Sequence, residues 1–213
     1  MKLAVLFFGM SKEEYDNYWY RTRYLIDYEK SYENYQQYIF EFFKRKGYDI
    51  DVYFTTNALN DADRNEICKK YNPVHCNFIQ NHPHHIIGRN SKIINVMDLC
   101  LKSGNTYDLV LITRFDLLFQ KDFNESNIQL DKFNMVSLLE KPNLICDNFY
   151  LFPYNYLKPF SDVAKNNFTG RFHDMKDELY EKINKDGDSV NYILNENCCV
   201  ADLSFYKIVR TLL

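Results

Sequence analysis

The most informative stretch of the chain, residues 107–119, reads Tyr-Asp-Leu-Val-Leu-Ile-Thr-Arg-Phe-Asp-Leu-Leu-Phe. Four large apolar side chains in a row, at residues 109–112, are typical of a strand buried on both faces of a parallel sheet. Arg114 and Asp116 follow this run almost at once. Because open α/β sheets bind ligands at the carboxyl ends of their strands, these two charged residues are the first candidates for a functional site.

Two more strands are predicted upstream. Residues 2–8 form another continuous apolar run, and residues 49–56 alternate apolar and polar positions before a polar end. Between them, residues 27–46 repeat aromatic and aliphatic side chains at helical spacing. Strand, helix and strand in this order form a βαβ unit. We therefore expect an α/β fold with a mixed, mainly parallel central sheet flanked by helices.

The rest of the chain shows no repeat, no linker and no clear boundary, so a single domain over residues 1–213 is expected. This domain could belong to a longer chain with further catalytic domains. A loop rich in His, Asn and Pro is predicted over residues 75–85, with Asn90 as the N-cap of the following helix. The other expected elements are a short helix from Asp61, strands near 135–139 and 148–152, and helices near 156–165, near 173–183 and from Asp188.

The composition is that of an ordinary globular domain, with 46% hydrophobic and 26% charged residues. The formal net charge is −3, so no basic excess exists to neutralise phosphates along a nucleic acid, and we exclude a general nucleic-acid binder. Aromatic residues make up 17% of the chain, with 18 tyrosines and 17 phenylalanines. This bias fits an AT-rich coding sequence, and it also fits tyrosines that stack on sugars.

The six cysteines are scattered without a CxxC pair, which favours free thiols in a reducing cytosol over a disulfide framework. No stretch approaches the ~20 apolar residues that a membrane-spanning helix needs. The apolar N-terminus lacks a small-residue cleavage site and is interpreted as a buried strand, not a signal peptide. We therefore predict a cytoplasmic protein without a transmembrane segment.

Asp116 is the residue whose position most needs an explanation. A carboxylate that leaves a buried strand costs free energy unless a cation pairs with it. One such partner is a divalent metal that carries a diphosphate, and another is Arg114, which could form a salt bridge across the end of the sheet. The residues alone leave both interpretations open.

Residues 107–119 resemble the "YDxVxxxRxDxxF" segment of nucleotide-sugar glycosyltransferases with the GT-A fold. The resemblance implies that Asp116, as the second acidic position of this segment, binds Mn²⁺ or Mg²⁺ that bridges the donor diphosphate. Arg114 stands at the first acidic position, where most of these enzymes have an aspartate, and is expected to reach phosphate or sugar. Residues 1–113 would then form the nucleotide-binding half, and residues 114–213 the metal and acceptor half.

The same resemblance covers residues 1 to about 155 and assigns further roles. It implies that the first two strand ends cradle the uridine of a UDP-sugar, and that Arg89 and Ser91 lie near ribose and phosphate. The aromatic-rich style is similar to that of capsid-glycan glycosyltransferases encoded by large algal DNA viruses such as chloroviruses. The strand-end residues expected at the nucleotide are Phe7, Phe8, Gly9, Thr55 and Thr56.

A sugar transfer to a glycan hydroxyl also needs a base when the anomeric centre is inverted. Residues 146–153 resemble the "DxFxxFP" stretch on the acceptor side of these enzymes, and Asp147 is the candidate base. A turn-capping role for Asp147 is the alternative. Two other activities remain open: a metal-dependent sugar-nucleotide hydrolase or nucleotidyltransferase at the same site, and a carbohydrate-binding module without turnover.

Two tempting patterns are interpreted as structural. Asp61-Ala62-Asp63 is a literal Asp-x-Asp, but no apolar strand leads into it, and acidic residues are favoured in a first helical turn by the dipole alone. The histidines between residues 75 and 85 match no zinc spacing and are expected in a polar loop.

Overall fold

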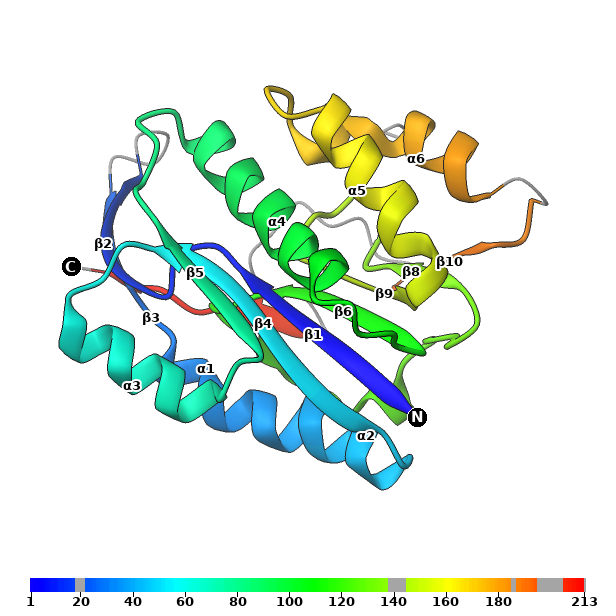
Figure 1. The fold of residues 1–213 in the computed structure, drawn as a ribbon, viewed down its shortest axis with the longest axis horizontal. Coiled ribbons are helices and arrows are strands. Elements are labelled where there is room, and N and C mark those ends of the chain that lie inside the picture. The colour runs from blue at the N-terminus through cyan, green and yellow to red at the C-terminus, as the bar shows by residue number, and fades with distance from the viewer. Residues whose placement is uncertain (18–21, 138–144, 185–186, 195–204, 213) are drawn as a thin grey trace.

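A seven-stranded sheet runs through the centre of the molecule (Figure 1). It is seen in a computed structural model that describes residues 1–17, 22–137, 145–184, 187–194 and 205–212. In spatial order the strands are β10 (Val190–Tyr192), β8 (Phe133–Met135), β9 (Phe149–Pro153), β6 (Leu109–Arg114), β1 (Lys2–Phe8), β4 (Asp49–Asn57) and β5 (His75–Ile79).

The sheet is mixed and mainly parallel. β9 runs antiparallel to both of its neighbours, β6 and β8, whereas β1 pairs in parallel with β4 and β6. The predicted α/β fold class is confirmed. The register places Phe8 opposite both Thr55 and Arg114, so the carboxyl ends of β1, β4 and β6 meet at one edge of the sheet.

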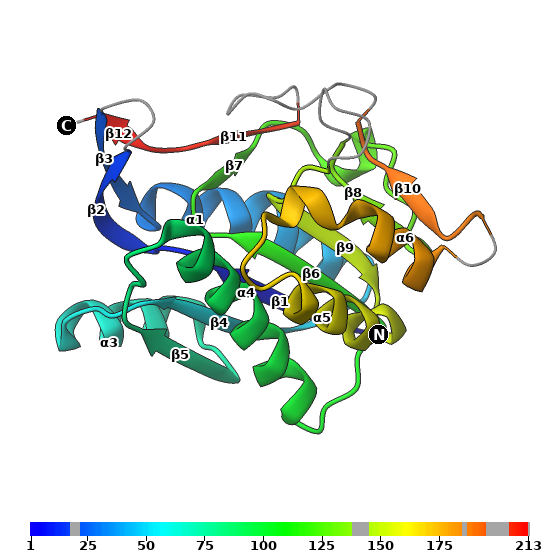
Figure 2. The same cartoon turned by 90° about the horizontal axis from the view of Figure 1, so that it is seen from above.

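Helices cover both faces of the sheet (Figures 1 and 2). Alternate residues of β1 enter two different apolar cores: Leu3, Val5 and Phe7 face one layer, and Ala4, Leu6 and Phe8 face the other. This alternation explains why β1 is apolar throughout, because neither face meets water. The first layer holds α1 (Glu29–Tyr35), a π-helical segment (Gln36–Phe40), α2 (Glu41–Arg45) and α3 (Asp61–Tyr71), and the second holds α4 (His85–Lys102), α5 (Leu157–Asn166) and α6 (Lys176–Ile183).

Two small sheets join the ends of the chain to this core. The C-terminal strands run along one side of the molecule toward the hairpin near the N-terminus (Figure 2). One small sheet pairs β11 (Tyr206–Ile208) with β7 (Leu117–Phe119), and the other has the order β12 (Thr211–Leu212), β3 (Thr22–Asp27), β2 (Lys12–Asn17).

Several predicted elements differ from the structure. Residues 75–79, expected in a loop, form β5, because Cys76 and Phe78 pack against the core beside β4. Residues 190–192, expected to be helical, form β10, which adds to β8 in parallel. α4 begins at His85, not at Asn90, whose buried amide instead donates to the carbonyls of Phe168 and Gly170.

Most of the large aromatic side chains are structural. The phenolic rings of Tyr28, Tyr35, Tyr53, Tyr150 and Tyr206 are fully buried. Aromatic pairs in edge-to-face and offset contact stabilise a core beyond the area they bury. These tyrosines are therefore not available to stack on a sugar at the surface.

Tyr35 joins α1 to the end of β6. Its hydroxyl lies 2.7 Å from Thr113 Oγ1 and donates to the carbonyl of Arg114 at 2.6 Å, whereas the buried hydroxyl of Tyr150 has no partner among the described residues. We expect Tyr35→Phe to lower the free energy of unfolding by about 1–3 kcal/mol, because it removes the hydrogen bonds to Thr113 and to the carbonyl of Arg114. Tyr150→Phe, the matched control, should change it little. Equal losses in urea unfolding of the two variants would contradict this account.

In the described part of the chain, no helix is long and apolar enough to cross a membrane. Cys68, Cys76 and Cys100 are free thiols, and Cys198 and Cys199 lie outside the described residues.

Candidate functional site

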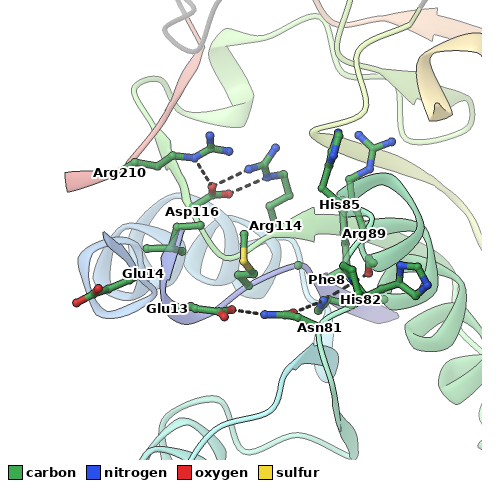
Figure 3. A pocket seen from close by; sticks show the side chains of 16 residues that line it. Phe8, Glu13, Glu14, Asn81, His82, His85, Arg89, Arg114, Asp116 and Arg210 are labelled. Carbon is green, nitrogen blue, oxygen red and sulfur yellow. Dashed lines mark hydrogen bonds and ion pairs between the residues drawn. The ribbon is translucent and has the colours of Figure 1, made fainter. Parts of the chain in front are cut away.

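A cavity of about 340 Å³ opens at the edge of the sheet where β1 and β6 end. Figure 3 shows the side chains that line it. They come from five parts of the chain: the end of β1, the β2–β3 hairpin, the segment from β5 into α4, the end of β6, and the C-terminal segment. The cavity therefore lies where an open α/β sheet is expected to bind its ligand.

Gly9 gives the chain its sharp exit from β1 into this cavity. Its φ is +104°, a conformation that L side chains rarely adopt, and no atom lies within 4 Å of where a Cβ would stand. Only glycine populates this region freely. Gly9 therefore leaves a bare stretch of backbone at the cavity wall, between the side chains of Phe8 and Met10.

The charged centre of the cavity is the carboxylate of Asp116. Both of its oxygens accept hydrogen bonds from Arg114, from Nε at 2.7 Å and from Nη2 at 2.6 Å. Arg210 Nε donates a third, longer bond of 3.4 Å to Asp116 Oδ2 (Figure 3). The parallel contacts between Arg114 and Asp116 are the bidentate pairing that suits a guanidinium and a carboxylate. The salt bridge that the sequence left open is present.

Burial and pairing act in opposite directions on these groups. Burial alone would raise the pKa of Asp116, but the charge and hydrogen bonds of Arg114, with a smaller contribution from Arg210, outweigh it and hold that pKa below its usual value. For Arg114, burial disfavours the cation and Asp116 favours it, and its pKa is raised. The three side chains thus carry two positive charges and one negative charge.

Arg210 is a cavity residue that sequence reasoning missed. The C-terminal segment reaches the site because β11 pairs with β7 and β12 pairs with β3. The backbone N–H of Val209 donates to the carbonyl of Asp116 at 2.7 Å, which fixes the neighbouring Arg210 beside the same residue. Asp116 and Arg210 are 94 positions apart, and no local pattern could have linked them.

A second chain of polar contacts lines the opposite wall. Asn81 donates to Glu13, and its Oδ1 accepts a hydrogen bond of 2.9 Å from Lys92 Nζ. Lys92 is almost fully buried, and burial lowers the pKa of its ammonium, with Glu13 acting against that shift. The amide of Asn81 therefore joins the ammonium group of Lys92 to the carboxylate of Glu13 on this wall; Figure 3 shows Glu13 and Asn81.

The beginning of α4 forms a third wall. His85, Gly88 and Arg89 line the cavity from its first turns, and the first turn contains no acidic residue that would offset the positive end of the helix dipole. Burial lowers the pKa of His85, with smaller effects from His84 and Arg89, so His85 is neutral near pH 7. Arg89 forms an ion pair with Asp147 and lies over the ring of Phe172.

The predicted site residues are distributed unevenly around this cavity. Phe8, Gly9, Arg89, Arg114 and Asp116 line it. The other predicted residues do not: Phe7 packs among Tyr35, Tyr71 and Phe115, Thr55 donates to Asn95, the Thr56 hydroxyl donates to Asn57 Oδ1 and lies 2.9 Å from Ser11 Oγ, Ser91 donates to the carbonyl of Ile87, and Asp147 is buried against Arg89.

The two patterns interpreted as structural have local partners. Asn60 caps α3 by accepting a hydrogen bond of 2.9 Å from the Asp63 N–H, and the Asp63 carboxylate pairs with Lys12 at 2.9 Å. His82 Nδ1 accepts from the His84 N–H, and the rings of His84 and His85 stack. Across the residues that the structure describes, no group of three or more His, Cys, Asp and Glu side chains could hold a metal ion.

The surroundings of Asp116 do not fit a resident divalent cation. Mn²⁺ and Mg²⁺ are hard ions that take several oxygen ligands. Here both carboxylate oxygens are engaged by Arg114, and Arg210 adds a second guanidinium beside them. An ion at Asp116 would have to displace these hydrogen bonds and lie next to two positive charges. Glu13 and Glu14 line the same cavity, but they do not form with Asp116 a group of described residues that could hold a metal ion.

Comparison with known proteins adds little beyond the fold. No protein-family model matches the chain, and no curated protein matches it. A proposed nucleotide-diphospho-sugar transferase from Desulfovibrio desulfuricans G20 is similar in structure, with 11% identity, a TM-score of 0.49, and coverage of 92% of this chain and 80% of that one. The glycosyltransferase GlyE from Streptococcus pneumoniae TIGR4 has 10% identity and a TM-score of 0.44; 91% of this chain is covered, and only 46% of that one. Likeness at this level argues for no shared activity.

Proposed function

We propose that this chain is a glycosyltransferase that moves a sugar from a nucleoside-diphosphate donor, a UDP-sugar, to a hydroxyl of a glycan. The observation that carries the proposal is the cavity at the carboxyl ends of β1 and β6, where four cationic side chains outnumber three carboxylates. A diphosphate is a compact anion whose oxygens match guanidinium and ammonium donors. The cationic residues in question are Arg89, Lys92, Arg114 and Arg210.

The chemistry of sugar transfer fits such a cavity. The bond between the anomeric carbon and a diphosphate oxygen breaks, and negative charge develops on the leaving diphosphate. Fixed cations that face this charge in a site shielded from water lower the barrier, because they are already oriented when the charge appears. The resemblance of residues 107–119 to glycosyltransferase segments supports the same reaction.

Uracil is the base that we assign to the donor. Phe8 and Gly9 line the cavity at the end of β1, and the backbone at Gly9 carries no side chain that would cover it. Phe7, Thr55 and Thr56 do not line the cavity, so our proposal gives them no direct contact with the uridine. Mn²⁺ or Mg²⁺ at Asp116, a chloroviral relationship and a cytoplasmic location stay predictions from the sequence.

Nucleotide binding tests the proposal without knowledge of the acceptor. Isothermal titration calorimetry of the wild-type chain with UDP, UDP-glucose, GDP and ATP should show binding of the uridine compounds, with GDP weaker. A carbohydrate-binding module would instead bind free oligosaccharides and none of these nucleotides. Equal affinity for UDP and GDP would count against the uracil assignment alone.

Asp147 is proposed as the base that removes the proton of the acceptor hydroxyl. We expect Asp147→Asn to lower kcat by at least ~10²-fold while KM for the donor stays near wild type, because deprotonation matters in the transition state. The ion pair with Arg89 sets the competing outcome: a carboxylate that only positions Arg89 would cost donor affinity instead.

Steady-state kinetics and calorimetry on the same variant separate these outcomes. Asp98→Asn is the matched control. Asp98 lies on α4 and also forms an ion pair, with Lys165 at 2.7 Å, but its partner does not line the cavity, whereas Arg89 does. Normal turnover by Asp147→Asn would remove the assignment of this residue as the base.

A further inference from the structure

The cavity holds positive charge at the place where the sequence predicts a metal ion. Arg114 and Arg210 approach one carboxylate, Asp116, from two different segments of the chain. Asp116 neutralises one of the two guanidinium groups, and the carboxylates of Glu13 and Glu14 line the same cavity from β2. The remaining positive charge faces a cavity large enough for a ligand, so an anion would complete the cluster.

Arg210 has N–H groups that are free to donate hydrogen bonds to such an anion. Its Nε is used by Asp116, but its two terminal nitrogens have no protein partner within the described residues. The side chain keeps a relative exposure of 25%, and it lines the cavity. Figure 3 shows these terminal nitrogens beyond the contact with Asp116. A guanidinium held at Nε with its other nitrogens free is pre-oriented to donate to phosphate oxygens.

The guanidinium group of Arg114 is also fixed by hydrogen bonds. Nε and Nη2 bind Asp116, and Nη1 donates to Asn148 Oδ1 at 3.0 Å. Asn148 in turn donates to the hydroxyl of Tyr206, which lies on β11 beside the segment that carries Arg210. The two arginines are therefore fixed by one shared network, and neither has to be ordered when a ligand arrives.

We propose that Arg114 and Arg210, oriented by Asp116, bind the donor diphosphate directly, so that donor binding requires no divalent cation. This inference rests on the proposed function. In the transfer step, the bond between the anomeric carbon and the diphosphate oxygen breaks, and its electron pair stays on that oxygen beside the two guanidinium groups. The acceptor oxygen forms the new bond to the anomeric carbon and gives its proton to a base. Asp116 is a positioning residue in this scheme.

The beginning of α4 adds to the same preference. Its first turn carries no acidic residue, and Arg89 and the buried Lys92 follow on the face that lines the cavity. Positive charge on this wall and on the Arg114–Arg210 side would hold a diphosphate from two directions. Neither wall offers oxygen ligands arranged for a metal ion among the residues described.

Calorimetry with UDP as the probe tests the inference in two buffers, one with excess EDTA and one with Mn²⁺. We expect wild-type affinities in the two buffers to agree within a few-fold. Arg210→Ala should weaken UDP binding by about 10- to 100-fold in both, the scale of one or two hydrogen bonds to a charged group. Arg210→Lys should recover part of the loss. Arg45→Ala is the control, because it removes the same charge from an arginine that pairs with Asp122 and does not line the cavity.

The possible outcomes separate this inference from the function on which it rests. Binding of UDP only in the presence of Mn²⁺ would overturn the inference and leave the sugar-transfer proposal in place. Unchanged UDP affinity in Arg210→Ala, with the variant folded by circular dichroism, would also overturn it. Absence of binding by every nucleotide in both buffers would overturn the proposed function as well.

Discussion

Arg114→Met should reduce the affinity of the chain for UDP by at least ~100-fold, because it removes the guanidinium that makes several charge-assisted hydrogen bonds at the cavity. The same change leaves the buried Asp116 with one long contact to Arg210. Breaking a buried ion pair on one side costs about 3–5 kcal/mol, so the free energy of unfolding should fall by a similar amount.

Two measurements keep these effects apart. Urea unfolding gives the loss of stability, and calorimetry at a temperature where the variant is folded gives the loss of affinity. Arg114→Lys retains the charge without the planar fork and should bind UDP with intermediate affinity. Full affinity in a folded Arg114→Met chain would show that the diphosphate is bound elsewhere.

Among substitutions in the cavity that keep the shape of the side chain, Asp116→Asn should lower the free energy of unfolding most. The amide keeps the shape of the side chain, but Arg114 and Arg210 lose the negative charge that compensates them, at a cost of about 3–5 kcal/mol. The pH dependence follows from the same pairing. Because the folded pKa of Asp116 lies below its unfolded value, its contribution to stability is complete above the unfolded pKa of about 3.9 and is lost as pH falls through the folded pKa.

Urea unfolding at pH 7 and at lower pH measures both parts of this expectation. Wild type should lose stability relative to Asp116→Asn as the pH falls below about 4. Asp122→Asn serves as a control, since its partner Arg45 is well exposed and their contact is 3.4 Å long. Parallel stability curves for wild type and Asp116→Asn would contradict the assigned ion pair.

The central strands and their ends could be predicted from the sequence because their signal is local. β1 after Lys2 and β6 up to Ile112 are apolar and buried, and the polar end of β6 falls at the edge of the sheet where ligands bind. Arg114 and Asp116 follow from this reasoning. The choice between a metal site and a salt bridge did not, because it depends on side-chain geometry that only the folded chain provides.

The rest of the site is built from contacts between distant segments. β2 is polar, with the sequence Lys-Glu-Glu-Tyr-Asp-Asn, and shows no alternation that would predict a strand. The hairpin that it forms with β3 nevertheless brings Glu13 to the cavity and pairs with β12. Arg210 then arrives beside Asp116 through strands of two and three residues, which are too short to leave a periodic pattern.

The role of the many aromatic residues could not be predicted from the sequence either. Seventeen phenylalanines and eighteen tyrosines were compatible with sugar stacking or with composition bias. Folding places the largest of them in two apolar cores on either side of the sheet. Burial of an aromatic ring depends on which strand or helix face it occupies, and even Phe8, which lines the cavity, has its side chain almost fully buried in one of these cores.

Mass spectrometry of the reaction products tests the central claim most directly. Wild type is incubated with UDP-sugars and simple glycosides as acceptors, once in EDTA and once in Mn²⁺. Water can serve as the acceptor where no glycoside reacts. Our account predicts release of UDP together with a glycoside one sugar larger, or with free sugar, and loss of both products in the folded Arg114→Met chain. Release of UMP with a sugar phosphate would indicate a hydrolase of the diphosphate bond, and equal product from wild type and Arg114→Met would contradict the account.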